Sequence, residues 1–574
     1  MELDNEKLRV LRHSTAHILA EAVLKLYPDA KLGIGPTIEE GFYYDIKFSQ
    51  PIEENDLAKI EKEMHKLLST NRKIEKEIIS YEEAKKMFAN NPYKTELIEQ
   101  YHEEGKVLSV YRQGGFFDLC AGPHLENTKD IKYFKLLSLA GAYWRGDVKN
   151  DQLTRIYGTA FFTKEDLDVY LNLLVERKKR DHRIIGKEMG IFMMSEYGPG
   201  FPFFLPNGMI IRKELEDYWI DLHRRHGYDF IMTPTMLSKE LWLTSGHYAN
   251  YHDNMFFSTI DEKEFAIKPM SCPGAMLVYK NDLHSYKELP IRLAELGHVH
   301  RYEASGALSG LFRVRAFTQD DAHIFLKEDQ LQDEIITLLK LYDEVYRQFG
   351  LSYHVELSTR PENKYIGSIE IWDKAEKALE EAIKHLAIPY KINPGDGAFY
   401  GPKLDFKLRD SMNRIWQCGT IQLDMNLPER FDITYVDENN ERVRPIMLHR
   451  AIFGSIERFI GILIENYAGH FPLWLAPEQV AVLPVAKPHE DRAMELVKMM
   501  KEVGLRPIYM SPEEKLGYRM RNAQIRKIPY TIVIGDEELA NNTVTYRRAQ
   551  NKEQIKTSVT EFIQMLKSER DEKR

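Results

Sequence analysis

The segment from Thr163 to Lys187 most constrains the fold of this chain, because it is dense in charged residues. It begins with Thr163-Lys-Glu-Asp166, which resembles a capping box with Asp in place of Glu or Gln. A polar, charged helix is a poor centre for a hydrophobic core, so we predict that it connects separate domains. The length of 574 residues supports this prediction, since about 150 residues per domain suggests about four domains.

The apolar pattern differs on the two sides of this connector. Before it, we predict an α+β domain whose expected elements are a helix at 8–26, a strand at 41–46 and a helix at 54–68. Residues 190–475 mix strands and helices without a regular βαβ period, which argues against a Rossmann fold or a barrel. From residue 479, strands alternate with helices and predict a small α/β domain. Its expected elements are strands 480–485, 507–510 and 530–534 and helices 490–503 and 516–527.

Composition excludes several classes of protein. The chain is 43% hydrophobic and 29% charged, which argues against a disordered or fibrous protein. No apolar run approaches the ~20 residues of a membrane helix, and the first residues lack a signal sequence. Three cysteines are too few for a disulfide framework and fit a reducing, cytoplasmic compartment. The net charge of −9 does not favour nucleic acid, although residues 477–574 carry 18 Lys and Arg against 15 Asp and Glu.

Histidine and cysteine recur at two places in the N-terminal region. His13 and His17 are four residues apart, so they share one face of the predicted helix. Cys120-Ala-Gly-Pro-His124 is the second element. Each alone is more often structural than functional. Together they suggest a polar cluster for acid–base chemistry or for zinc, which prefers Cys and His ligands.

Arginines and aromatic residues flank a Gly/Ser loop in the middle of the chain. Arg301 and Glu303 precede the loop 305–310, and Arg313 and Phe317 follow it. Planar guanidinium groups bind phosphate in a bidentate manner, and an aromatic ring can stack on a base. No Walker lysine motif or G-x-G-x-x-G accompanies them. The alternative is a polar hairpin with scattered ion pairs.

Arg458 lies in Gly454-Ser-Ile-Glu-Arg458, at the start of an apolar helix. A buried arginine is costly unless it is paired, which favours a functional role. The alternative is a partly exposed arginine whose charged end reaches water.

These elements, in this order, resemble bacterial threonyl-tRNA synthetases, a family of class II aminoacyl-tRNA synthetases. Residues 227–234 resemble class II motif 1, Arg301 to Phe317 motif 2, and Gly454 to Arg458 motif 3. Five more specific strings are Lys268-Pro-Met-Ser-Cys-Pro-Gly274, Phe317-Thr-Gln-Asp-Asp-Ala-His323, Gly397-Ala-Phe-Tyr-Gly-Pro-Lys403, Trp416-Gln-Cys-Gly-Thr420 and Met447-Leu-His-Arg450. The resemblance extends from His13 to Arg548.

The resemblance implies a multidomain α+β architecture. An editing domain would occupy residues 1–162, a helical linker 163–188, the antiparallel-sheet catalytic core 189–475 and an α/β anticodon-binding domain 476–574. Motif 1 implies a homodimer. No association with a membrane is expected. The family's N-terminal ubiquitin-like domain is not expected in this sequence.

The resemblance also implies the site residues. Cys272, His323 and His449 would hold one zinc ion per subunit, and three N/S ligands with an open position are typical of catalytic zinc. ATP, with Mg²⁺, would contact Arg301, Glu303, Arg313, Phe317, Gln417, Thr420 and Arg458. L-threonine would contact Gln319, Asp321, Tyr400, Gln422 and Ser455, with Asp321 near the ammonium. The catalytic set would be Arg301, Arg313, Arg458, Lys403 and His247, the last assisting proton transfer at the tRNA ribose.

The expected reaction is ATP-dependent activation of threonine to threonyl-adenylate, followed by transfer to the 3′ end of tRNA(Thr). Reading the threonine hydroxyl rejects valine by about 10⁴–10⁵, whereas serine lacks only one methyl and is rejected about 10–200-fold. A second, hydrolytic site is therefore needed. The resemblance assigns His13, His17, Cys120 and His124 to hydrolysis of Ser-tRNA(Thr), acting without a metal. Glu538 and Arg547 match anticodon contacts, and Arg547 suits a guanine edge.

Two alternatives remain open. One is a synthetase-like RNA-binding regulator without catalysis, although such proteins usually lose a motif arginine or zinc ligand that this chain retains. The other is a stand-alone zinc hydrolase that uses the His13 and Cys120 cluster, which would leave most of the chain without a role.

Overall fold

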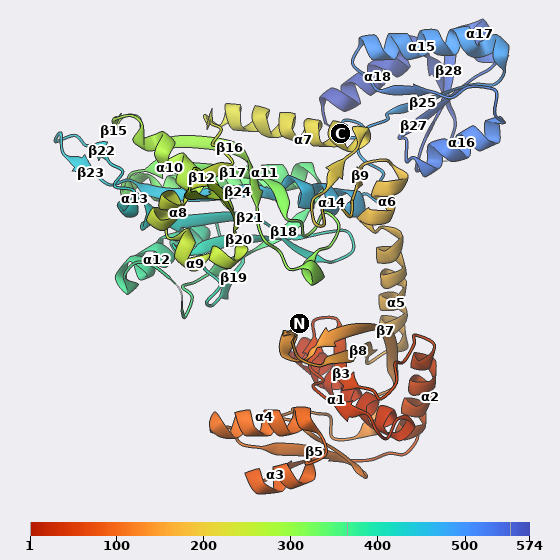
Figure 1. The fold of residues 1–574 in the computed structure, drawn as a ribbon. Coiled ribbons are helices and arrows are strands. Elements are labelled where there is room, and N and C mark those ends of the chain that lie inside the picture. The colour runs from red at the N-terminus through yellow and green to blue at the C-terminus, as the bar shows by residue number, and fades with distance from the viewer. Residues whose placement is uncertain (1, 148, 364, 552, 574) are drawn as a thin grey trace. The chain divides into compact units, whose positions relative to one another are not determined.

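The computed structural model describes residues 2–147, 149–363, 365–551 and 553–573. The chain forms two compact units, residues 1–175 and 176–574 (Figure 1). The division lies inside the segment predicted to be a connector. Among the described residues, no helix is long and apolar enough to cross a membrane.

The N-terminal unit is built on helix α1 (Glu2–Leu26), whose apolar face, including Leu11, Ile18 and Leu19, is fully buried. It packs with α2 (Asp56–Leu68) on a mainly antiparallel sheet. The strands are β1 (Lys31–Leu32), β2 (Thr37–Ile38), β3 (Gly41–Lys47), β7 (Tyr133–Tyr143) and β8 (Gln152–Phe161). The two predicted helices and the predicted strand at 41–46 are confirmed.

A smaller layer follows in the same unit, built from a three-stranded antiparallel sheet and two helices. These elements are β4 (Ile74–Ile78), β5 (Ser109–Gln113), β6 (Phe116–Leu119), α3 (Tyr81–Met87) and α4 (Pro92–Glu103). The end of β6 places Cys120 beside α1.

The connector is not one continuous polar helix to about Lys187, so that prediction is wrong. It forms α5 (Lys164–Lys179) and then α6 (His182–Glu188). Asp181 separates them, because its side chain accepts a hydrogen bond from the backbone nitrogen of Arg183 at 2.8 Å and caps α6. His182 and Ile185 are buried, so α6 belongs to the packed part of the second unit.

The second unit contains an eight-stranded sheet in the order β11-β16-β17-β24-β21-β20-β18-β19. All pairs are antiparallel except the two edge pairs, β11 with β16 and β18 with β19. This agrees with the lack of a βαβ period. The strands are β11 (Asp229–Phe230), β16 (Ile291–His300), β17 (Ala316–Leu326), β18 (Ser352–Ser358), β19 (Tyr390–Asn393), β20 (Lys403–Arg409), β21 (Ile415–Asp424) and β24 (Ile446–Ser455).

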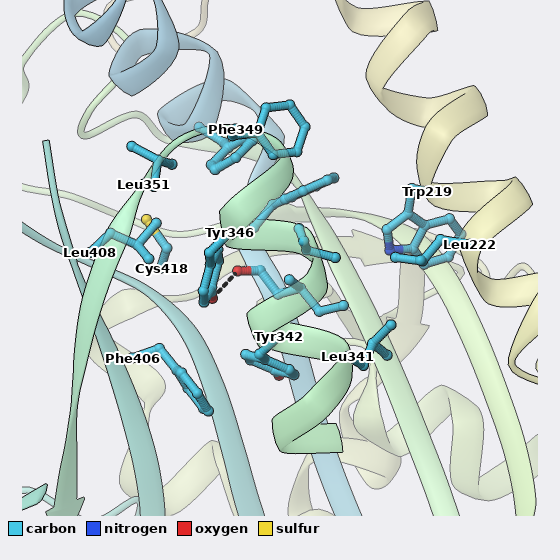
Figure 2. Close-up of a cluster of buried hydrophobic side chains, with 14 of the residues drawn as sticks. Trp219, Leu222, Leu341, Tyr342, Tyr346, Phe349, Leu351, Phe406, Leu408 and Cys418 are labelled. Carbon is cyan, nitrogen blue, oxygen red and sulfur yellow. Dashed lines mark hydrogen bonds between the residues drawn. The ribbon is translucent and has the colours of Figure 1, made fainter. Parts of the chain in front are cut away.

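Helix α11 (Leu331–Gln348) fixes the middle of this sheet through two buried tyrosines (Figure 2). The Tyr342 hydroxyl lies 2.8 Å from the Thr420 carbonyl and 2.7 Å from that of Ala451, and Tyr346 donates to the Ile452 carbonyl at 2.8 Å. The other helices of this core are α7 (Pro206–Arg225), α12 (Ile369–His385) and α14 (Ile456–Asn466).

Shorter elements surround the sheet. They are β9 (Phe192–Met193), β10 (Phe203–Phe204), β12 (Met236–Ser238), α8 (Lys239–Ser245), α9 (His247–Asn250), β13 (Phe256–Ile260), β14 (Lys263–Ile267), α10 (Cys272–Lys280), β15 (His284–Ser285), α13 (Leu427–Arg430), β22 (Tyr435–Val436) and β23 (Arg442–Val443). Single 3-10 turns occur at 128–130, 144–146, 252–254, 305–307, 328–330 and 487–489.

The C-terminal part has a sheet in the order β26-β25-β27-β28-β29, parallel over the first three strands and antiparallel after them. Its elements are β25 (Val480–Pro484), α15 (Glu490–Glu502), β26 (Pro507–Tyr509), α16 (Leu516–Ile525), β27 (Tyr530–Ile534), α17 (Asp536–Asn541), β28 (Thr543–Arg548), β29 (Ile555–Ser558) and α18 (Val559–Asp571). The predicted α/β alternation is confirmed, with an antiparallel extension.

Candidate functional site

A cavity of about 440 Å³ lies over the eight-stranded sheet. All of the residues predicted to bind ATP, threonine or zinc line it. They are Cys272, Arg301, Glu303, Arg313, Phe317, Gln319, Asp321, His323, Tyr400, Gln417, Thr420, Gln422, His449, Ser455 and Arg458. His247 and Lys403 are not among the lining residues.

Cys272, His323 and His449 meet at one end of this cavity. The two histidines are register partners on β17 and β24, and Cys272 begins α10. All three are buried, with ligand atoms within 4.8 Å of one another. Neither ring nitrogen of His323 has a hydrogen-bond partner within the described chain, which is unusual for a buried polar group. His449 Nε2 contacts Asp424 Oδ2 at 2.8 Å, and a carboxylate that orients the imidazole in this way is typical of metal-binding histidines.

The polar groups beside this trio could hold a small amino acid. Gln319 and Asp321 share the cavity face of β17 with His323, because side chains alternate along a strand. Gln319 Oε1 is buried without a partner in the described chain. Burial, and then repulsion from Glu295 and Asp320, raises the pKa of Asp321 to about 8. A bound cation would favour its charged form. Tyr400 donates to Gln422 Oε1 across the same space.

The other end of the cavity is cationic. The guanidinium carbon of Arg301 lies 5.1 Å from the centre of the Phe317 ring, and its Nε donates to the Pro269 carbonyl at 3.1 Å. Arg313 Nε lies 3.7 Å from Glu303 and its side chain is half exposed. Both arginines therefore keep nitrogens available for an anion.

Arg458 reaches the same space from α14. Ser455 caps that helix, because its hydroxyl accepts from the Arg458 backbone nitrogen at 3.2 Å. Arg458 Nε donates to the Phe312 carbonyl at 3.0 Å and its Nη1 to the Gln417 carbonyl at 3.1 Å. Gln417 Nε2 in turn donates to Asp405 Oδ1 at 2.6 Å.

The two remaining catalytic candidates lie apart from the cavity lining. Lys403 Nζ pairs with Asp405 at 3.0 Å. His247 is fully buried, with Nε2 3.2 Å from Met270 Sδ and 3.8 Å from Cys272 Sγ, and burial lowers its pKa to about 3. Contact between His247 and a ribose would require Met270 to move.

Sequence reasoning missed Asp320, whose carboxylate binds the backbone just before and at the start of motif 3. A β-bulge interrupts the register between Gln319 and Asp321, and the fully buried Asp320 carboxylate faces β24 there. It accepts hydrogen bonds from the backbone nitrogens of Ile452, Phe453 and Gly454 at 2.9, 3.0 and 2.8 Å. The sequence shows Asp320 within Phe317-Thr-Gln-Asp-Asp, but it gives no sign of the three backbone nitrogens that Asp320 binds.

The predicted N-terminal cluster also assembles. His13 Nδ1 donates to the Pro123 carbonyl at 3.2 Å, so its Nε2 faces Cys120 Sγ, 3.4 Å away, as an acceptor. His124 Nε2 lies 3.3 Å from the same sulfur. Its Nδ1 is 3.2 Å from the Ser14 hydroxyl. The His17 ring centre lies 4.2 Å from that of His124.

A buried ion pair lies beneath this cluster and was not predicted. Lys94 Nζ is 2.7 Å from Asp118 Oδ1, and Tyr44 donates to Asp118 Oδ2. His17 Nε2 lies 4.0 Å from the same carboxylate. Asp118 lies two residues before Cys120 in the sequence, but Lys94 and Tyr44 come from distant elements and show no sequence signal.

Electrostatics keep the cluster uncharged. Burial lowers the pKa of His13, His17 and His124 and raises the pKa of Cys120 to about 11. Neutral imidazoles can accept or pass a proton, whereas the thiolate needed for nucleophilic attack is disfavoured. The arrangement therefore suits the positioning of a water molecule by hydrogen bonds to neutral imidazoles.

The two anticodon candidates lie on neighbouring elements, α17 and β28. Both carboxylate oxygens of Glu538 are already used, by the Gly535 backbone nitrogen at 3.0 Å and the Thr545 hydroxyl at 2.6 Å. Arg547 Nε is buried and lacks a hydrogen-bond partner in the described chain.

Comparison with known proteins agrees with this geometry. Residues 256–467 match the tRNA synthetase class II core domain (G, H, P, S and T). Residues 479–569 match an anticodon binding domain, and 108–157 the second additional domain of threonyl and alanyl tRNA synthetases.

Full-length relatives and a solved structure point the same way. Threonine–tRNA ligases of Acetivibrio thermocellus and Clostridium tetani are each 54% identical, covering 97% and 99% of this chain and 87% and 89% of theirs. The crystal structure of the RNA binding domain of threonyl-tRNA synthetase from Cryptosporidium parvum is 38% identical, with a TM-score of 0.66, covering 68% of this chain and 98% of that one. The chain therefore belongs to the threonine–tRNA ligase family of class II aminoacyl-tRNA synthetases.

Proposed function

We propose that this chain joins threonine to tRNA(Thr) at the expense of ATP and hydrolyses Ser-tRNA(Thr) in its N-terminal unit. The observation that carries the first activity is the shared cavity, in which the Cys272, His323 and His449 trio adjoins a cationic, aromatic pocket. An amino acid and a nucleotide fit side by side there. The cluster at Cys120 supports the second activity.

In this proposal the amino acid lies between Asp321 and Gln319, with its neutral amino group near the Asp321 carboxylate. Its carboxylate attacks the α-phosphate of ATP, and pyrophosphate leaves with Mg²⁺. Arg301, Arg313 and Arg458 offset the charge that develops on phosphate. The ribose hydroxyl at the tRNA 3′ end then attacks the adenylate carbonyl, and AMP leaves.

Zinc would be held by Cys272, His323 and His449, which fit it because His323 has two unpartnered buried nitrogens and His449 is oriented by Asp424. When bound, the ion supplies a Lewis-acid site for the amine and hydroxyl of threonine, which disfavours valine. The chain itself contributes Gln319, Tyr400 and Gln422, which line the cavity around the proposed zinc site.

For hydrolysis, His13 directs an unprotonated Nε2 toward Cys120, and His124 Nε2 lies 3.3 Å from the same sulfur, so that a water molecule can be held there to attack the ester. The buried pair of Lys94 and Asp118 lies beneath this cluster, with His17 Nε2 4.0 Å from Asp118. Residues 1–162 would form this editing domain, 163–188 the linker, 189–475 the synthetic domain and 476–574 the anticodon-binding domain, with Arg547 contacting a base.

Self-association is part of the proposal. β11 lies at one edge of the eight-stranded sheet, and the neighbouring Met232 is 91% exposed. A homodimer would cover this edge. Supplying aminoacyl-tRNA for translation also implies a cytoplasmic location.

Pyrophosphate exchange tests the synthetic activity directly. The expected result is threonine-dependent exchange, weaker exchange with serine, and little with valine or proline. Absence of exchange with threonine, or equal exchange with proline, would contradict the proposal.

A further inference from the structure

His182 lies behind the cavity, and the proposed chemistry gives it no role. It is 2% exposed and is the first residue of α6, just beyond the connector helix α5. With Asp181 and Glu465 it forms one of the groups of side chains that could hold a metal ion among the described residues. Its hydrogen bonds point to a different role.

Both ring nitrogens of His182 are engaged by the protein. Nε2 lies 3.0 Å from the backbone nitrogen of Leu311, which can only donate, so Nε2 is an unprotonated acceptor. Nδ1 therefore carries the proton and donates to Glu465 Oε1 at 2.6 Å. The same oxygen accepts from the His182 backbone nitrogen at 2.9 Å. No ring lone pair remains for a metal ion, and one neutral tautomer is specified.

The bond to Leu311 holds the turn that presents Arg313. Ser309 and Arg313 close this turn with backbone hydrogen bonds of 3.1 and 3.3 Å. The Phe312 ring packs on the His182 ring with centres 4.1 Å apart. The Phe312 carbonyl accepts from Arg458 Nε at 3.0 Å. His182 thus supports the turn on which both arginines depend.

Gly310 shows how closely the turn and the imidazole fit. Its φ is +48°, a region that favours glycine, and a Cβ there would lie 2.2 Å from His182 Nε2. A side chain at 310 would therefore displace either the turn or His182.

We propose that His182 is a positioning residue for ATP binding, which holds the Leu311 turn so that Arg313 and Arg458 face the phosphates. The inference rests on the proposed function, since it takes the nucleotide site from there. It makes the first residue of α6, the second helix of the connector, part of the support for the turn at residues 309–313.

The test is threonine-dependent pyrophosphate exchange at varied ATP and threonine with His182→Phe, His182→Gln and Gly310→Ala. His182→Phe keeps the ring but leaves a buried N–H without its acceptor, so the KM for ATP should rise about tenfold or more. Gln offers an acceptor and should restore much of the affinity. Gly310→Ala should also raise the KM for ATP, because its added methyl group would displace the turn from His182. Gly517→Ala, where no atom lies within 4 Å of the added Cβ, is the matched control.

A rise confined to the KM for ATP, with the KM for threonine and the hydrolysis of Ser-tRNA(Thr) unchanged, supports the positioning role. An unchanged KM for ATP in both His182→Phe and Gly310→Ala would overturn it, as would an equal rise for both substrates. If His182→Phe does not fold, Gly310→Ala decides. Wild-type protein without any threonine-dependent exchange would instead refute the proposed function.

Discussion

The two cysteine–histidine clusters of this protein contain the same residue types and differ in what their nitrogens already contact. In the cavity of the second unit, both ring nitrogens of His323 lack a hydrogen-bond partner within the described chain. In the N-terminal unit, one ring nitrogen of His13 and one of His124 contact a protein oxygen, and the other ring nitrogen of each lies beside Cys120. The first cluster leaves two buried nitrogens of His323 for an ion to satisfy, whereas in the second cluster only His17 Nδ1 is buried without a hydrogen-bond partner among the described residues. Residue composition alone does not separate the two.

The supports of the clusters differ as well. His323 and His449 are neighbours on adjacent strands, beneath which Asp320 and Tyr346 hold the β24 backbone. The N-terminal cluster instead joins a helix to the loop after β6. We expect the two activities to respond separately to substitution.

Removing one cysteine from each cluster should break the comparison most sharply. Cys272→Ala should abolish stoichiometric zinc and lower threonine-dependent exchange about 100-fold or more, because a Lewis-acid site worth several kcal/mol is lost. Cys120→Ala is the matched control and should retain both. Metal analysis and exchange measure the two effects. Full zinc content in Cys272→Ala would refute the assigned trio.

Asp320→Asn should impair synthesis without touching hydrolysis. The amide cannot accept from three backbone N–H groups as the carboxylate does, so β24 and the start of α14 lose their alignment. A loss of about 1.5–3 kcal/mol, or roughly 10–100-fold in exchange, is expected for hydrogen bonds to a charged group. Deacylation of Ser-tRNA(Thr) is the internal control. Normal exchange would show that Asp320 does not align motif 3.

Asp424→Asn tests whether His449 is a metal ligand. A carboxylate that orients a metal-binding histidine typically contributes about 10–100-fold to metal affinity, so zinc should be lost at correspondingly lower chelator concentrations. Asp118→Asn, beside the other cluster, should leave the zinc affinity unchanged. Equal chelator sensitivity in the wild type and Asp424→Asn would count against the site.

Tyr346→Phe should have the smallest effect. It removes one buried hydrogen bond to the Ile452 carbonyl and should lower the free energy of unfolding by about 1 kcal/mol. Exchange should fall only slightly, because Tyr342 still supports the neighbouring strands. A large loss of activity without a change in stability would mean that the sheet is less rigid than we infer.

The sequence predicted the layers of the fold better than the contacts of the sites. The helix at 8–26 and the strand at 480–485 follow from apolar spacing. The antiparallel core was implied by the family resemblance, and spacing indicated only the lack of a βαβ period. The break at Asp181 was missed, although an Asp before a helix is a recognised cap, because charge continued through it.

The site was less accessible to such reasoning. Cys272, His323 and His449 are far apart in the chain, and only the pairing register of β17 and β24 unites the histidines. Resemblance, not spacing, identified them. Asp320 and Lys94 were missed because their roles depend on partners that only the folded chain provides. The net charge of −9 was a poor guide, since the cavity concentrates arginines locally.

The central claim is that one unit makes a product that the other unit checks. Aminoacylation of tRNA(Thr) with serine by wild type and by a His13→Ala, His17→Ala double variant tests it most directly. General acid–base groups typically contribute about 10²–10⁴-fold, so the variant should accumulate Ser-tRNA(Thr) while the wild type does not. Both should form Thr-tRNA(Thr) at the same rate. Equal serine accumulation in the two proteins, or none in the variant, would contradict the account.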